Sequence, residues 1–147
     1  IYGPHDNYHL EDAHVIPALI HKCYLAKQND APFIMRGTGK PLRQFIYSED
    51  LAKLIMWTLE SNKEPTIILS VSEKDEVSIE YVTRLIAREF DYEHRLEFDT
   101  NFSDGQYKKT ADNSLLMSKT DFEFTPIDKG IRKAVKWFIN NFERARK

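Results

Sequence analysis

The sequence predicts an α/β fold in which helices alternate with short strands. Segments with apolar residues three or four positions apart, typical of amphipathic helices, alternate with short runs of strand-forming residues. Residues 66–71 (TIILSV) are nearly all apolar, which favours a strand buried on both faces, as in a parallel sheet. Because one such strand cannot build a sheet, we expect the main sheet to be largely missing from this chain.

The first two helices are expected at residues 14–28 and 48–61. The earlier segment has an apolar stripe at helical spacing, and its proline lies in the first turn, where proline is tolerated. In the later segment Ser48 is the expected N-cap, and Glu49 and Asp50 lie at the positive end of the helix dipole. The stripe of the earlier helix consists of Val15, Leu19, Cys23 and Ala26.

The second half of the chain predicts two more helices and one strand. Ser78 is the expected cap of a helix over residues 79–90, and Thr125 is the expected cap of a last helix with Pro126 at its first position. Residues 95–99 (RLEFD) are expected to form a strand, and residues 101–113 a loop. The apolar stripes are Val82, Leu85, Ile86 and Phe90 on one helix, and Ile127, Ile131, Val135, Phe138 and Phe142 on the other.

Composition excludes several classes of protein. The 147 residues suffice for one domain with a core. A net charge of -2 argues against nucleic-acid binding, and no apolar run approaches the ~20 residues of a membrane span. The single cysteine, Cys23, excludes an internal disulfide framework and suits a reducing compartment. The abrupt start (IYGPHD), without a signal peptide, leads us to expect a fragment.

A glycine turn with local positive charge is the first candidate for function. Gly37 and Gly39 are two positions apart among the cations Arg36, Lys40 and Arg43. A Walker loop needs four residues between its glycines and a helix after them, and a dinucleotide fingerprint needs a third glycine. Neither pattern is present, so the turn is not expected to hold phosphate at a helix N-terminus.

The same turn is better interpreted as a connection between two short strands, residues 33–36 and 43–47. Under one interpretation it is a hairpin whose cations are merely solvated. Under the other, the glycines allow a sharp turn that directs Arg36 and Arg43 into one cleft, where they meet a phosphate group. The sequence of the turn alone does not separate the two.

Histidines gather near the start of the chain, but their spacing does not predict a metal site. Zinc needs convergent ligands, and this segment is polar and loop-like after Gly3-Pro4. His14 is the one histidine placed just before a helix, where an imidazole titrating near neutral pH could transfer a proton or act only as a cap. Lys22 follows about 12 Å along the same helix. The cluster comprises His5, His9, His14 and His21.

Two lysines follow a turn signal late in the chain. Asp104-Gly105 marks the turn, and Lys108 and Lys109 come directly after it. Loop lysines are usually solvated. Alternatively, they close over an anionic ligand as a second phosphate contact.

Four segments of the chain together match the pattern of a known family. They are residues 2–22 (YGPHDNYHLEDAHVIPALIHK), 37–52 (GTGKPLRQFIYSEDLA), 98–112 (FDTNFSDGQYKKTAD) and 137–147 (WFINNFERARK). The chain resembles the GDP-L-fucose synthase family of extended short-chain dehydrogenases. This resemblance implies 3,5-epimerisation and NADPH-dependent 4-reduction of GDP-4-keto-6-deoxymannose by a cytoplasmic homodimer that uses NADP and no metal. It also implies that residues 1–147 are the C-terminal substrate-binding domain, without the Rossmann domain.

The resemblance assigns roles to residues near the start of the chain. His14 is similar to the family's acid, which protonates the sugar carbon during epimerisation and lies beside the nicotinamide. Ile1 falls with His14 among the implied cofactor contacts. Lys22 is similar to a basic residue that contacts the substrate.

The resemblance also assigns the cations of the turn and the late loop. Arg43 matches the arginine that grips the diphosphate, for which a planar fork is suited. Asp104 and Lys109 match substrate contacts on a closing loop. Arg36 departs from the pattern, because many members have tryptophan there, stacking near the nucleotide. The remaining alternatives are a related nucleotide-sugar epimerase or dehydratase and a non-catalytic GDP-sugar binding module.

Overall fold

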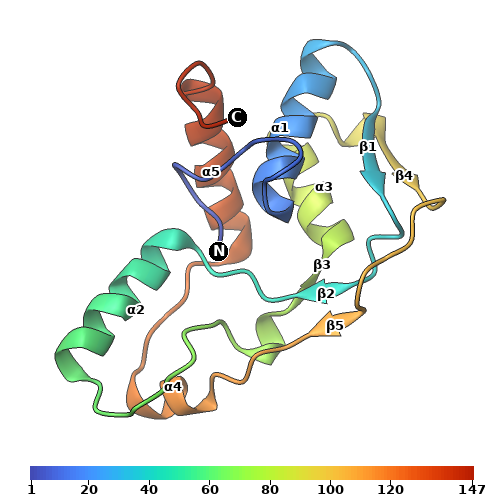
Figure 1. Cartoon of the computed structure of the whole chain (residues 1–147). Helices are drawn as coiled ribbons and strands as arrows, with labels where there is room; N and C mark the ends of the chain where they lie inside the picture. The colour runs from blue at the N-terminus through green and yellow to red at the C-terminus, as the bar shows by residue number, and fades with distance from the viewer.

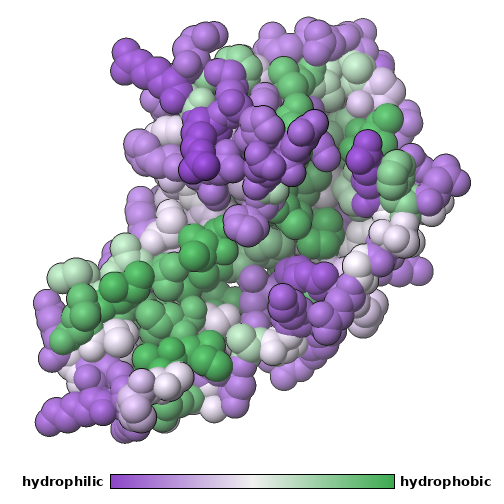
Figure 2. Space-filling model, viewed as in Figure 1, coloured by the Kyte–Doolittle hydropathy of each residue, from purple (hydrophilic) through white to green (hydrophobic).

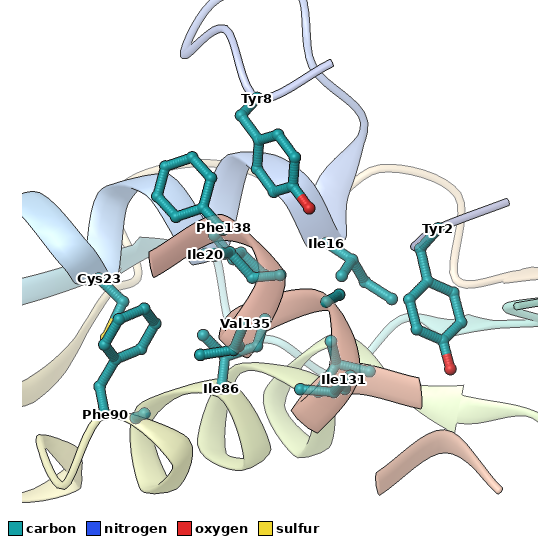
Figure 3. Close-up of a cluster of buried hydrophobic side chains, with 14 of the residues drawn as sticks. Tyr2, Tyr8, Ile16, Ile20, Cys23, Ile86, Phe90, Ile131, Val135 and Phe138 are labelled. Atoms are coloured by element: carbon teal, nitrogen blue, oxygen red, sulfur yellow. The ribbon is translucent and has the colours of Figure 1, made fainter. Parts of the chain in front are cut away.

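Three helices pack against one another and enclose the larger of two apolar cores in the computed structural model, which describes residues 1–147 (Figure 1). They are α1 (Val15–Gln28), α3 (Ile79–Glu89) and α5 (Ile127–Asn140). Figure 3 shows the apolar side chains of these helices directed toward one another, with Tyr2 and Tyr8 of the N-terminal segment beside them. The burial of these stripes is the main favourable contribution to folding.

Five short strands form two small sheets on one side of the helices (Figure 1). The strand β1 (Phe33–Arg36) pairs in parallel with β4 (Leu96–Asp99). The strand β2 (Leu42–Arg43) is central in the other sheet, antiparallel to β3 (Val77–Ser78) and parallel to β5 (Lys108–Lys109). Two one-turn 3-10 helices cover Glu73–Asp75 and Glu93–Arg95.

A second lobe, at the lower left in Figure 1, contains α2 (Ser48–Ser61), α4 (Ser114–Lys119) and residues 62–72. Its small core consists of Ile46, Leu54, Val71 and Leu116. The buried carboxylate of Asp50 ties this lobe to the segment before α5. One oxygen accepts from the Thr125 amide at 2.6 Å, and the other from the Thr125 hydroxyl at 2.9 Å.

The structure confirms an α/β fold of helices and short strands and no large sheet. The helices expected from residues 14–28, 48–61 and 79–90 are present, as is the strand expected at 95–99. Ser78 caps α3, since its hydroxyl accepts from the Tyr81 amide at 3.0 Å.

The strand predicted at residues 66–71 is wrong: this segment forms no strand. A strand needs a neighbour for its backbone groups, and only side chains reach this one, from Gln44 to the Val71 carbonyl and from Asn113 to the Ser70 carbonyl. Its side chains still alternate, because Ile68 is exposed while Ile67, Leu69 and Val71 pack on the small core.

The structure also excludes the interpretation of the glycine turn as a hairpin, because β1 and β2 belong to different sheets. Two predicted caps differ as well. Ser48 is the first residue of α2, after Tyr47 at the N-cap position, and Thr125 binds Asp50 and leaves Pro126 at the N-cap of α5. The loop predicted at residues 101–113 contains the short strand β5, and the sequence analysis missed α4.

An apolar face of the second lobe remains uncovered, visible as green atoms at the lower left of Figure 2. Leu59 is 77% exposed, which is unusual for a leucine on a well-formed helix. Exposed apolar patches are typical of surfaces that contact another protein, a membrane or a ligand. The face, which we call the α2 apolar face, consists of Ile55, Met56, Leu59 and Ile68.

Candidate functional site

The glycine turn leads from β1 to β2 through backbone that other residues rarely adopt. Gly37 has φ of 90° and Gly39 has φ of 73°. A Cβ on Gly37 would lie 2.5 Å from Oδ1 of Asp104, and one on Gly39 would lie 2.8 Å from Cβ of Glu80. Both glycines are therefore needed, because the turn packs closely against the late loop and the start of α3.

A cavity of about 190 Å³ lies beside this turn and brings together residues distant in sequence. Arg36 comes from the end of β1 and Arg43 from β2, while Asp104 and Gly105 come from the late loop. Val15, the first residue of α1, also lines it. Three of the predicted site residues, Arg36, Arg43 and Asp104, thus line one cavity. His14 does not line it but directly precedes Val15, which does.

Asp104 joins the late loop to the glycine turn. Its Oδ1 accepts from the Thr38 amide at 2.8 Å, and its Oδ2 accepts from the Thr38 hydroxyl at 2.5 Å. These hydrogen bonds from Thr38 lower the pKa of the Asp104 carboxyl below its ordinary value. The carboxylate therefore stays ionised and fixes the loop at the edge of the cavity.

Arg43 is held by backbone carbonyls and not by a carboxylate. Its Nη1 donates to the Leu42 carbonyl at 2.7 Å and lies 3.5 Å from the Tyr107 carbonyl. A Cβ added to Gly105 would lie 3.9 Å from its Nη2, so the loop glycine leaves room for the guanidinium. In the sheet, Arg43 is the register partner of Lys109.

The predicted cations of the site share one electrostatic property: none forms an ion pair. Burial lowers the pKa of Lys22, and the positive charge of Arg36 lowers it further. Some other cations of the chain do pair with acids, as Lys108 does with Glu73. The predicted site cations without an ion pair are Lys22, Arg36, Arg43 and Lys109.

His14 and Ile1 lie outside the group of residues that line the cavity. His14 occupies the N-cap position of α1, but its side chain makes no capping hydrogen bond, and the imidazole is exposed. Ile1 is 65% exposed, next to Tyr2, whose backbone pairs with Tyr47. The structure therefore leaves both side chains free to meet a ligand or another domain.

Comparison with known proteins agrees with this geometry. Residues 1–70 match the NAD dependent epimerase/dehydratase family. Over its whole length the chain is 57% identical to the GDP-L-fucose synthase of Dictyostelium discoideum and 46% identical to a probable GDP-L-fucose synthase of Drosophila melanogaster. The chain is a relative of the GDP-L-fucose synthases. The expected resemblance is thereby confirmed.

A solved GDP-L-fucose synthetase has the same fold. The crystal structure of the Naegleria fowleri protein bound to NADP superposes with a TM-score of 0.95 at 47% identity, over 99% of this chain and 44% of that one. The chain spans about half the length of the curated relatives it matches, 47% of the Dictyostelium protein and 49% of the Drosophila protein. The matched half is the C-terminal portion of the extended short-chain dehydrogenase fold.

Sequence reasoning missed three residues of this fucose synthase relative that shape the site. Thr38 binds Asp104, Phe102 lies under the guanidinium of Arg36 with 4.5 Å from ring centroid to Cζ, and Gln44 binds Ala111. Each contact spans about 66 positions in the chain, so no local spacing could reveal it. The one signal in the sequence was a phenylalanine, Phe102, placed between the turn-forming residues Asn101 and Ser103.

Three further observations concern a larger groove, metal ligands and membrane spans. A larger groove of about 920 Å³ lies between the main body and the second lobe, but it contains none of the predicted site residues. No three His, Cys, Asp or Glu side chains cluster closely enough to hold a metal ion. None of the helices has both the length and the apolar character needed to cross a bilayer.

Proposed function

We propose that the cavity beside the glycine turn binds the diphosphate of a GDP-sugar, and that the intact protein is a GDP-L-fucose synthase. Such an enzyme converts GDP-4-keto-6-deoxymannose to GDP-L-fucose by 3,5-epimerisation and 4-reduction. The observation that carries the proposal is the convergence of unpaired cations on this side of the molecule, although the chain has a net charge of -2. The 57% identity to a named fucose synthase supports the same substrate class.

Arg43 is the proposed grip on the diphosphate. Its guanidinium already uses one donor on backbone carbonyls, which fixes the orientation of the remaining donors before a ligand arrives. A planar fork in a fixed orientation can bind two phosphate oxygens at once. Lysine lacks this fork, so the two residues are not equivalent here.

The other residues provide charge and closure around this grip. Lys22 and Lys109 are proposed substrate contacts because neither has an acidic partner, and Lys109 lies opposite Arg43 in the sheet register. Asp104 is a proposed substrate contact on the closing loop, where each carboxylate oxygen retains a lone pair after binding Thr38. Arg36 adds positive charge at the end of β1.

His14 is the proposed acid of epimerisation. Its imidazole is exposed and makes no capping hydrogen bond to α1, and the next residue, Val15, lines the cavity. The imidazole can therefore reach a sugar bound there. NADPH, the reduced form of the NADP bound in the Naegleria relative, would supply hydride for the 4-reduction. In this chain only His14 and Ile1 are proposed to contact the cofactor. The glycine turn is not followed directly by a helix whose N-terminus could hold the pyrophosphate.

Residues 1–147 are proposed to be the substrate-binding domain of a larger unit, with a Rossmann domain for NADP outside this chain. The α2 apolar face supports this division, since its leucine and isoleucines are exposed where a covering domain would bury them. A cytoplasmic homodimer is proposed for the intact protein, on the pattern that the family implies.

The test is a titration of the 147-residue chain with GDP and with NADPH, followed by NMR. We expect GDP to bind at roughly millimolar concentration, about 4 kcal/mol, because half of the cleft is open to water. Arg43→Ala should weaken this affinity by about 1 kcal/mol, roughly fivefold, and Arg43→Lys should recover only part. Lys136→Ala, which removes an exposed lysine of α5, is the matched control.

Two results would contradict the proposal. Equal GDP affinity for the wild type, Arg43→Ala and Arg43→Lys would remove Arg43 as the diphosphate grip. Micromolar NADPH binding by this chain would show that the cofactor site lies here and that the proposed domain division is wrong.

A further inference from the structure

A buried carboxylate next to β3 has no part in the proposed function. Glu76 directly precedes β3, and its side chain is only 4% exposed. Acidic side chains are almost never buried to this extent unless they are paired. The partners of this carboxylate come from β5 and the residue after it. The Thr110 hydroxyl donates to Oε1 of Glu76, and Nζ of Lys108 lies 3.5 Å from its Oε2.

These two partners lie on either side of Lys109 in the chain. Because side chains of an extended segment alternate between faces, Lys108 and Thr110 point to one face of the sheet and Lys109 points to the other. The two hollows agree with this division, since Glu76 lines the larger groove and Arg43 lines the small cavity. Arg43 is the register partner of Lys109, so these two cations share the face of the small cavity.

The backbone alone holds β5 weakly. The strand has only two residues and lies at the edge of its sheet, beside β2 (Figure 1). Lys109 and Arg43 repel each other, because they lie side by side and neither has an ion pair. This repulsion moves Lys109 away from Arg43 unless β5 is held from the opposite face, where Glu76 lies.

Lys108 has a second acidic partner, which is far more exposed. Its Nζ forms an ion pair with Glu73, whose side chain is 67% exposed. The hydrogen bond to Glu73 and the charges of both acids raise the pKa of Lys108, so the lysine stays charged. Because exposed ion pairs contribute little to stability, the buried Glu76 is the stronger tie between β3 and β5.

We infer that Glu76 is a positioning residue for diphosphate binding: by holding Lys108 and Thr110 it keeps Lys109 beside Arg43, so that both cations meet the same diphosphate. This inference rests on the proposed function, because it requires a diphosphate at Arg43. It makes an acidic residue favour the binding of an anion. Removal of a carboxylate strengthens anion binding through charge alone, whereas loss of the positioning role weakens it.

The test is a titration of the 147-residue chain with inorganic pyrophosphate, followed by NMR at low ionic strength, where exposed charges are least screened. Glu76→Ala should lower the affinity about two- to fivefold, the size of one exposed ion pair, which is what Lys109 would lose. Glu73→Ala is the matched control, because it removes the same charge and another partner of Lys108. Its affinity should equal or slightly exceed that of the wild type.

A second pair of variants tests the same tie from β5 without a change of charge, and it decides the question if Glu76→Ala does not fold. Thr110 is exposed, so valine, which has the same shape, is tolerated there. Thr110→Val removes the hydroxyl that binds Glu76 and should lower pyrophosphate affinity about twofold. Thr110→Ser keeps a hydroxyl and should restore most of this loss.

Lys109→Ala separates positioning from a general loosening of the fold. If Glu76 acts through Lys109, then Glu76→Ala should lower the affinity of the wild type but should cost nothing further in Lys109→Ala. A purely structural role would give the same loss in both backgrounds.

The outcomes decide the inference separately from the proposed function. It would be overturned by an affinity of Glu76→Ala equal to or above that of the wild type. The same holds for equal losses with and without Lys109, for no effect of Lys109→Ala, and for equal affinities of Thr110→Val and Thr110→Ser. Absence of pyrophosphate binding by the wild type would overturn the proposed diphosphate site, and the inference with it.

Discussion

His14 precedes α1 at the position where a side chain usually caps the helix, yet it caps nothing. A group with neither a structural partner nor burial is available for proton transfer. In the protein that carries both halves of the enzyme, His14→Asn should lower epimerisation by about 10²–10⁴-fold while leaving GDP affinity nearly unchanged. Turnover is measured with GDP-4-keto-6-deoxymannose.

The control for this substitution is His94→Asn, which changes another exposed histidine that does not line the cavity. It should leave turnover as in the wild type. If His14→Asn and His94→Asn turned over substrate equally well, His14 would have no role as the acid.

At the residue scale, the sequence identified the charged residues that line the cavity but not the hydrogen bonds that hold them. Arg36, Arg43 and Asp104 were identified as site residues, and they line one cavity. The ties that hold them could not be read from the sequence. Thr38 is separated from Asp104 by 66 positions, and a turn threonine has no spacing that reveals its partner.

At the scale of elements, the side chain of Gln44 forms hydrogen bonds just beyond the point where the backbone pairing of β2 and β5 stops. Its Oε1 accepts from the Ala111 amide at 2.7 Å, while its Nε2 donates to the carbonyls of Ala111 and Val71. The amide thus continues the pairing of β2 with β5 and fixes the end of the loop that carries Lys109. Lysine and arginine are held opposite each other as a result.

Gln44→Ala should therefore loosen β5. Loss of these partly buried hydrogen bonds should lower the free energy of local opening at Lys109 and Ala111 by about 1–3 kcal/mol, measured by amide hydrogen exchange. Gln106→Ala, on the same loop but exposed, is the control and should not change it. Unchanged protection in Gln44→Ala would show that the backbone alone holds the loop.

His21 links α1 to the N-terminal segment and to α5, and it makes stability depend on pH. Its Nδ1 donates to the Tyr8 carbonyl at 2.8 Å, and its ring packs against Phe138. Burial lowers the pKa of His21 below 6.5, and the nearby charges of Lys147 and His9 lower it further. The folded protein therefore binds its proton less readily than the unfolded chain does.

It follows that the unfolded chain takes up more protons as the pH falls below about 6.5. The contribution of neutral His21 to stability is complete above this pH and is lost toward lower pH, with a slope of at most about 1.4 kcal/mol per pH unit. Urea unfolding of the wild type and His21→Gln between pH 7.5 and 5.5 measures it. Parallel pH dependence in both proteins would show that other groups are responsible.

The elements that the sequence predicted well are those defined by local spacing. The helices at 14–28, 48–61 and 79–90 follow from apolar stripes and end residues within one segment. The pairing of strands is non-local, so the sequence could not exclude the hairpin interpretation: β1 pairs with β4, about 60 residues later in the chain. Strands of two residues, such as β2 and β5, have too few positions to show a period.

For the whole molecule, the sequence correctly predicted that a large sheet is missing, but it wrongly predicted that residues 66–71 form a strand. Residues 66–71 have strand composition and alternating exposure, yet no backbone neighbour in this chain. The second lobe therefore ends in the α2 apolar face and not in a sheet. The chain spans about half the length of its relatives, and under the proposed domain division the other half would cover this apolar surface.

This surface should make the chain self-associate. Leu59 projects from α2 at 77% exposure, so pairing two copies through the α2 apolar face removes apolar area from water in each. Sedimentation velocity should show a weight-average mass that rises with protein concentration. Leu59→Lys should shift this rise to concentrations several-fold higher, because each buried lysine would lose hydration. Glu60→Gln, at its exposed neighbour on the same helix, also raises the net charge by one unit and should have a smaller effect. A chain that stays monomeric at every concentration, or equal behaviour of the two variants, would show that this face is stable in water and needs no covering domain.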